Sequence, residues 1–209
     1  MTGFALPEMS SAEPATFVEF WRGLYTSTDE VYLRHLKDGH KINTDDVIAL
    51  MQWKAGPRHA KRAEAYGRAT PINSLNARRP WTVMDDASLM ELRDELEVAL
   101  KDAGLQTSGS IIWLTFLCHL AQPSTTPIYD VNAWTAWGYI EGWLKSSQLA
   151  MTPVRFKTYL GYRTWFNDVT NACAVDPRDF DRALKMFGQF LRSPVGRRTV
   201  VEHDAVLSL

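Results

Sequence analysis

The chain has 209 residues and a formal net charge of -1; 45% of its residues are hydrophobic and 22% are charged. This composition is typical of a globular protein and excludes a disordered or low-complexity chain. The near-neutral charge also excludes a polycation, so nucleic acid could be bound only through a local basic face.

The two cysteines, Cys118 and Cys173, do not form a CxxC pair. Their number and spacing exclude a disulfide scaffold, a zinc ribbon and a four-cysteine iron–sulfur cluster. The first residues contain no basic segment followed by an apolar run, and no apolar run is long enough to span a bilayer. We therefore expect a cytoplasmic protein without a membrane segment, a metal or a cofactor.

Helical signals follow one another along the chain, and no alternating pattern indicates a sheet. Residues 70–84 contain two prolines and two asparagines, which is typical of a loop or broken structure. The pattern assigns no structure to the tail, residues 194–209. The sequence predicts one all-α domain over residues 1–209, a compact bundle of about eight or nine helices. The expected helices cover residues 14–24, 28–36, 44–55, 58–69, 86–103, 110–121, 130–144, 152–172 and 176–192.

Charge is segregated along the chain. Residues 54–79 contain seven basic residues and one acid, whereas residues 85–102 contain seven acids and two basic residues. The basic segment could form a phosphate-binding face, or it could be an ordinary solvated helix surface beside an acidic one.

The most informative stretch begins with the small-residue turn Ser108-Gly109-Ser110, which precedes an apolar helix and a proline-bearing loop. The turn would place backbone N–H groups at a helix N-terminus, where anions bind readily. Asp130 follows the loop at the start of the next helix. Aspartate is a favoured N-cap residue, so Asp130 could serve as a cap, as a functional carboxylate, or as both.

This arrangement resembles the core of the helix-hairpin-helix DNA glycosylase superfamily over residues 105–165. The resemblance implies two packed helical lobes with a cleft, a hairpin at Ser108–Ser110 and a catalytic carboxylate at Asp130. The hairpin here keeps only Gly109, and Ile111 and Ile112 stand where bifunctional members carry a lysine. The resemblance therefore implies a monofunctional glycosylase, without Schiff-base lyase chemistry at that position.

Such an enzyme would bind double-stranded DNA as a monomer and hydrolyse the N-glycosidic bond of a flipped damaged or modified base. Aromatic faces would hold the flipped base, and N–H groups and cations would bind the phosphates. The expected base-pocket residues are Trp53, Trp113, Tyr129, Asn132 and Trp134. The expected phosphate-binding residues are Ser108, Gly109, Ser110, Arg155 and Arg163.

Several of these residue types also have ordinary structural interpretations. Trp134 and Trp137 are spaced as core residues of a helix, His119 as a hydrogen-bonded core histidine, and Cys118 as a buried thiol. The polar residues of the expected loop could enter a duplex, or could simply belong to a loop. These residues are Asn73, Asn76, Arg78 and Arg79.

Two other functions fit the same sequence. The chain could be a helical DNA-binding module that binds phosphates through the hairpin but has no catalytic activity. Its DNA affinity would then depend on the salt concentration. A helical interaction protein with a tryptophan-rich surface would not bind DNA, and its basic residues would be scattered.

Overall fold

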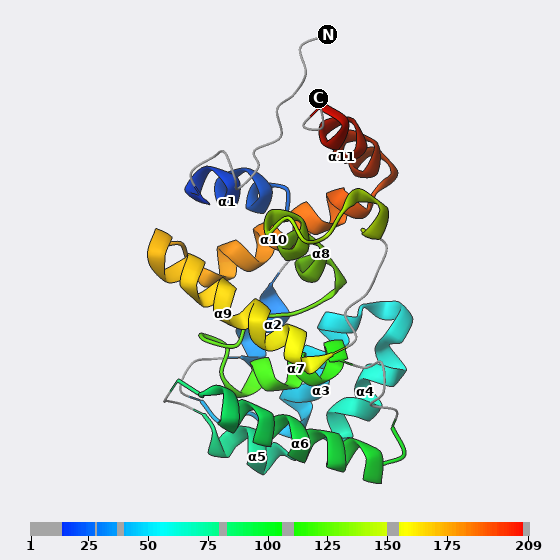
Figure 1. Ribbon diagram of the computed structural model, residues 1–209. Helices are drawn as coiled ribbons and strands as arrows, with labels where there is room; N and C mark the ends of the chain where they lie inside the picture. The colour runs from blue at the N-terminus through cyan, green and yellow to red at the C-terminus, as the bar shows by residue number, and fades with distance from the viewer. Residues whose placement is uncertain are drawn as a thin grey trace. The chain divides into compact units, whose positions relative to one another are not determined.

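In the computed structural model, the residues described are 14–27, 29–36, 40–79, 83–105, 111–149 and 155–206. They form eleven α-helices, two short 3₁₀ helices and no strand (Figure 1). The all-α prediction is therefore confirmed. The helix count exceeds eight or nine because two helices lie in segments to which the sequence assigned none.

The chain divides into two compact units. Among the described residues, the first unit holds 14–26, 128–149 and 157–206, and the second holds residues between 27 and 127 together with 155 and 156. The prediction of a single domain over residues 1–209 stays a prediction.

The first unit contains six helices. One of them, α9, begins at Phe156, a residue that is assigned to the second unit. Helix α10 packs against α1, α8 and α11. Phe187 of α10 lies at the centre, with its ring 5.3 Å from that of Phe17 and 5.0 Å from that of Trp21. The helices are α1 (Pro14–Gly23), α8 (Val131–Ile140), η2 (Ser146–Gln148), α9 (Phe156–Cys173), α10 (Pro177–Arg192) and α11 (Pro194–Val206).

The second unit is built around α7 (Ile111–Ala121), nine of whose eleven residues are buried. His119 is one of them, and its Nδ1 lies 2.6 Å from the carbonyl oxygen of Thr126 while its Nε2 lies 2.8 Å from the Tyr32 hydroxyl. His119 is thus a hydrogen-bonded core residue, as its structural interpretation predicts. The other helices are α2 (Glu30–His35), α3 (Thr44–Ala55), η1 (Pro57–His59), α4 (Ala60–Ala69), α5 (Ile72–Ala77) and α6 (Asp86–Asp102).

Helix α5 occupies Ile72–Ala77, within the segment 70–84 that was expected to be a loop or broken structure. The Asn76 side chain bonds both the backbone N–H and the carbonyl of Ile42. The Arg79 side chain is only 4% exposed and donates to the carbonyls of His40 and Leu120. These residues hold the segment against the rest of the second unit, because buried polar groups need hydrogen-bond partners. Helix α11 likewise occupies most of the tail that had no assigned structure.

Glycine at position 188 allows α10 to approach the first turn of α8. A Cβ atom at this position would lie 2.0 Å from the carbonyl oxygen of Asn132. Backbone atoms cannot give way as a flexible side chain can, so the two helices touch through their main chains. This contact fixes the start of α8 against α10.

We predict that Gly188→Ala lowers the free energy of unfolding by about 3 kcal/mol, because the added methyl group forces the helices apart. Urea unfolding followed by circular dichroism measures this change. Gly23→Ala is the matched control, since a Cβ at position 23 meets nothing within 4 Å. Equal unfolding midpoints for the two variants would show that the close contact does not exist.

Candidate functional site

Asp130 is the N-cap of α8 and is partly exposed. Its Oδ1 accepts hydrogen bonds from the backbone N–H of Asn132, at 2.8 Å, and from that of Ala133, at 3.0 Å. These bonds confirm the interpretation of Asp130 as a cap. They also stabilise a negative charge on this carboxylate, as does the positive end of the helix dipole.

Three buried tyrosines pack beside Asp130. The Tyr129 ring lies 5.3 Å from the Tyr159 ring and 5.0 Å from the Tyr162 ring. The Tyr162 hydroxyl donates a long bond, 3.5 Å, to the carbonyl of Ile128, whereas the buried Tyr129 hydroxyl has no hydrogen-bond partner among the described residues. The extended segment that precedes α8 is therefore enclosed by aromatic rings.

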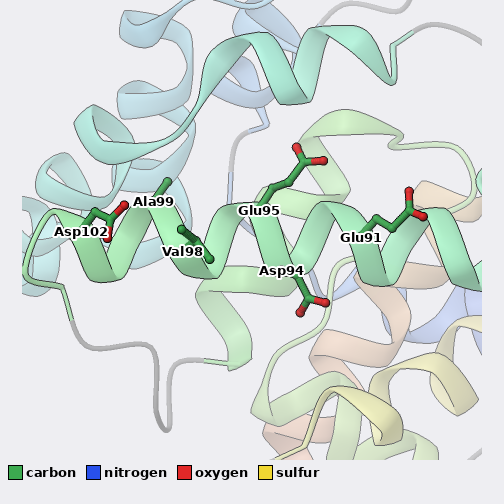
Figure 2. Close-up of a pocket in the computed structure, with 6 residues that line it drawn as sticks. All are labelled: Glu91, Asp94, Glu95, Val98, Ala99 and Asp102. Carbon is green, nitrogen blue, oxygen red and sulfur yellow. The ribbon is translucent and has the colours of Figure 1, made fainter.

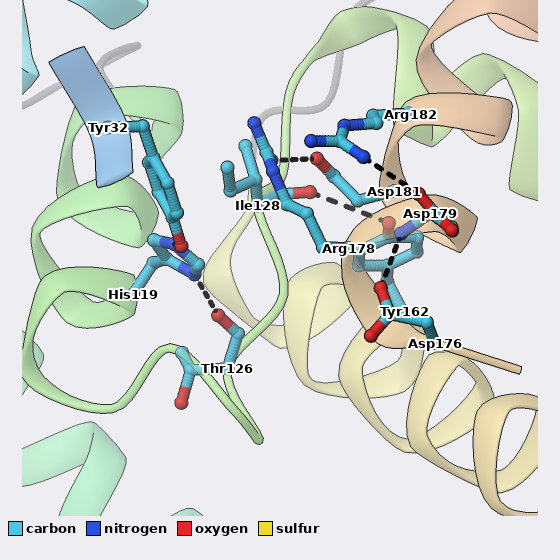
Figure 3. A network of polar contacts seen from close by, with 10 residues as sticks. All are labelled: Tyr32, His119, Thr126, Ile128, Tyr162, Asp176, Arg178, Asp179, Asp181 and Arg182. Atoms are coloured by element: carbon cyan, nitrogen blue, oxygen red, sulfur yellow. Dashed lines mark hydrogen bonds and ion pairs between the residues drawn. The ribbon is translucent and has the colours of Figure 1, made fainter. Parts of the chain in front are cut away.

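Helix α10 contributes a second carboxylate, Asp181. It is 8% exposed and bonds Arg178 Nη1 at 2.6 Å. Figure 3 shows the Tyr162 hydroxyl bonded to the Ile128 carbonyl and the Asp181 carboxylate bonded to Arg178. Burial raises the pKa of Tyr162 well above its usual value, and the negative charges of Asp181 and then Asp130 raise it further. Both carboxylates therefore lie close to this tyrosine.

A cation from the end of α10 completes the site. Arg192 is partly buried and donates from Nη1 to the Leu149 carbonyl at 2.9 Å. Burial and the neighbouring charge of Arg197 lower the pKa of Arg192, whereas the charge of Asp130 raises it. Asp130 thus lies in the field of a positive group of its own unit.

Four of the predicted site residues are neighbours in the sequence and lie on one short segment of the first unit: Tyr129, Asp130, Asn132 and Trp134. Trp134 is 6% exposed, and its ring lies edge-on to that of Trp143 at 5.7 Å. Trp134 therefore belongs to the core, as its structural interpretation predicts. Asn132 is partly exposed, and its carbonyl is the atom that Gly188 approaches. Arg163, on α9, is only 6% exposed.

The other predicted site residues lie elsewhere. Trp53 and Trp113 belong to the second unit, where Trp113 stacks on Tyr66 with ring centroids 5.4 Å apart. Arg155 is exposed and is also assigned to the second unit. The predicted hairpin, Ser108, Gly109 and Ser110, lies outside the described residues.

The basic segment 54–79 is partly used inside the second unit. Arg68 pairs with Glu64 at 2.7 Å, and Arg78 pairs with Glu95 of the acidic segment at 2.6 Å. Together with the buried Arg79, these pairs leave fewer cations for a phosphate than the sequence count indicates.

The outer face of α6 forms a shallow acidic groove (Figure 2). Its side chains repeat at helical spacing along a single helix. The hydrogen bond from Arg78 lowers the pKa of Glu95 further below neutral pH. Such a surface repels phosphate and is not a candidate nucleic-acid interface. The groove is lined by Glu91, Asp94, Glu95, Val98, Ala99 and Asp102.

Within the described ranges, no three His, Cys, Asp or Glu side chains lie together in a way that could hold a metal ion. None of the helices described is long and apolar enough to cross a membrane. Comparisons with protein-family models, with curated proteins and with solved structures found no match.

Sequence reasoning identified Asp130 and Tyr129 but missed three residues of α10: Asp181, Gly188 and Arg192. Of these three, only Gly188 gave a signal in the sequence. Glycine is unfavourable inside a helix, so a glycine within the expected helix 176–192 indicates close packing. Asp181 and Arg192 lie more than fifty residues after Asp130. Their approach to this carboxylate depends on the fold.

We predict that the free energy of unfolding falls as the pH rises above about 10. Burial raises the pKa values of Tyr129 and Tyr162, so both stay neutral in the folded chain when the unfolded chain has already lost these protons. The folded state then binds more protons, and its stability is lost with increasing pH. Tyr129→Phe should make this loss less steep, as urea unfolding between pH 9 and 11 can measure. An unchanged steepness would contradict the assignment of Tyr129 to a buried, neutral site.

Proposed function

We propose that this protein is a monofunctional DNA glycosylase that hydrolyses the N-glycosidic bond of a flipped damaged or modified base, with Asp130 as its catalytic carboxylate. The observation that carries the proposal is the geometry of Asp130: a partly exposed carboxylate, held in one orientation by two backbone N–H groups. The resemblance of residues 105–165 to helix-hairpin-helix glycosylases supports the choice of reaction.

The reaction needs a fixed negative charge. Breaking the bond between sugar and base develops positive charge on the sugar, and a nearby carboxylate stabilises this charge. The same group can orient the attacking water. Hydrogen bonds from the backbone N–H groups of Asn132 and Ala133 favour the charged form of the Asp130 carboxylate. Asp130 can therefore cap α8 and keep the negative charge that the proposed reaction needs.

A helical DNA-binding module without catalysis is the second candidate. The capping bonds of Asp130 favour it, because a cap alone explains an aspartate at this position. The two candidates differ in one respect: only the enzyme needs the charge of Asp130 as well as its hydrogen bonds.

The test uses Asp130→Asn, because asparagine caps a helix about as well as aspartate but carries no charge. The purified protein is incubated with duplexes that each contain one modified base, and the released base is measured by mass spectrometry. We expect the wild type to release at least one base, and Asp130→Asn to reduce that rate by about 100-fold or more. The affinity for the same duplex should change less than threefold.

Asp176→Asn is the matched control, since Asp176 is the N-cap of α10 and accepts a hydrogen bond from the Asp179 N–H at 2.9 Å. This variant loses the same charge from the same kind of position and should keep its activity. Base release by Asp130→Asn at the wild-type rate would exclude the catalytic role. DNA binding without any base release would favour the module.

A further inference from the structure

Helices α10 and α11 meet at a tight corner in the first unit. Helix α10 ends at Arg192, α11 begins at Pro194, and only Ser193 lies between them. The Ser193 hydroxyl donates to the Phe190 carbonyl at 2.6 Å and accepts from the Gly196 N–H at 3.0 Å. A Cβ on Gly196 would lie 1.9 Å from the Phe190 carbonyl oxygen, so the corner requires a glycine there. The corner is therefore closely packed.

Three arginines lie at this corner. Arg197 donates from Nε, at 3.1 Å, and from Nη2, at 2.8 Å, to the carbonyl of Arg192. Arg197 and Arg198 are exposed, and Arg192 is partly exposed. A guanidinium group has five N–H donors, so the two bonds of Arg197 leave donors for a further acceptor.

The segment that forms the corner is itself positive. Residues 192–201 contain three basic residues and no acid. Burial and then the charge of Arg197 lower the pKa of Arg192, whereas the charge of Asp130 raises it. A phosphate placed against this corner would be attracted by both positive charges.

The corner lies next to the start of α8. Gly188 and Arg192 are four residues apart and so lie on the same side of α10. Gly188 touches the carbonyl of Asn132, two residues after Asp130. Arg192 follows one turn further along the same side, and the charge of Asp130 acts on it. Arg197 is bonded to the backbone of Arg192.

We propose that Arg192, Arg197 and Arg198 form a binding site for the backbone phosphates of DNA beside Asp130. The choice of DNA rests on the proposed function, whereas the preference for phosphate diesters rests on the cluster itself. Guanidinium groups match phosphate oxygens in geometry and charge, and each phosphate contact releases counterions from the duplex. The site would hold the strand on one side of the nucleotide that Asp130 attacks.

The experiment measures the affinity of the full-length protein for an unmodified 20-base-pair duplex at several salt concentrations, by fluorescence anisotropy. We expect the double variant Arg197→Gln/Arg198→Gln to make the slope of log affinity against log salt shallower by about 1.8, since each lost phosphate contact removes about 0.9. The variant Arg197→Lys/Arg198→Lys keeps both charges and should keep most of the slope.

The control is Arg58→Gln/Lys61→Gln, which removes two exposed positive charges from the second unit. Its slope should equal that of the wild type. An equal decrease in both double variants would show a general effect of net charge and overturn the proposal. Tighter binding to an RNA duplex than to DNA, with the same dependence on Arg197 and Arg198, would overturn the assignment to DNA.

The test of this phosphate site can fail or succeed independently of the test of glycosylase activity. Base release combined with an unchanged slope in Arg197→Gln/Arg198→Gln would overturn this site and leave the glycosylase. A shallower slope in a protein that releases no base would support the site and leave a DNA-binding module. No DNA affinity in the wild type would overturn the site.

Discussion

The main-chain contact between α10 and the first turn of α8 is the constraint on which the candidate site depends. Gly188 brings α10 against the Asn132 carbonyl, and the N–H of the same Asn132 bonds the carboxylate of Asp130. Asn132 is thus held at both of its backbone polar groups: its carbonyl lies against Gly188, and its N–H bonds Asp130. Any side chain at position 188 would move α10, and with it Asp181 and Arg192.

Under the proposed function, one carboxylate has two tasks. As a cap it satisfies N–H groups that the first turn of a helix leaves without partners. As a functional group it presents a negative charge in a region lined by tyrosine rings and approached by the positive Arg192. The two tasks are compatible because capping fixes the orientation of the carboxylate, and a fixed charge stabilises a developing cation without reorganising first.

Much of the first unit could be predicted from local sequence signals. Asp130 stands where a cap is favoured and caps α8 as expected, and α10 begins with Asp176 as its N-cap at the start of the expected helix 176–192. The sequence did not predict α5, because the asparagines of residues 70–84 are typical of turns, whereas Asn76 bonds the backbone of a segment more than thirty residues away. The candidate site was also predicted only in part, because its contacts join residues that are far apart in the sequence. Nothing near Gly188 in the sequence identifies the carbonyl it approaches.

The proposed role of Asp130, to present its charge to the sugar of a flipped nucleotide, can be tested without knowing the base. A duplex with a cationic pyrrolidine in place of one sugar imitates the charge of the transition state, whereas a tetrahydrofuran at the same site has the shape without the charge. We expect the wild type to bind the pyrrolidine duplex about tenfold or more tightly than the tetrahydrofuran duplex, and Asp130→Asn to remove this preference. Equal affinity of the wild type for both duplexes would contradict this role.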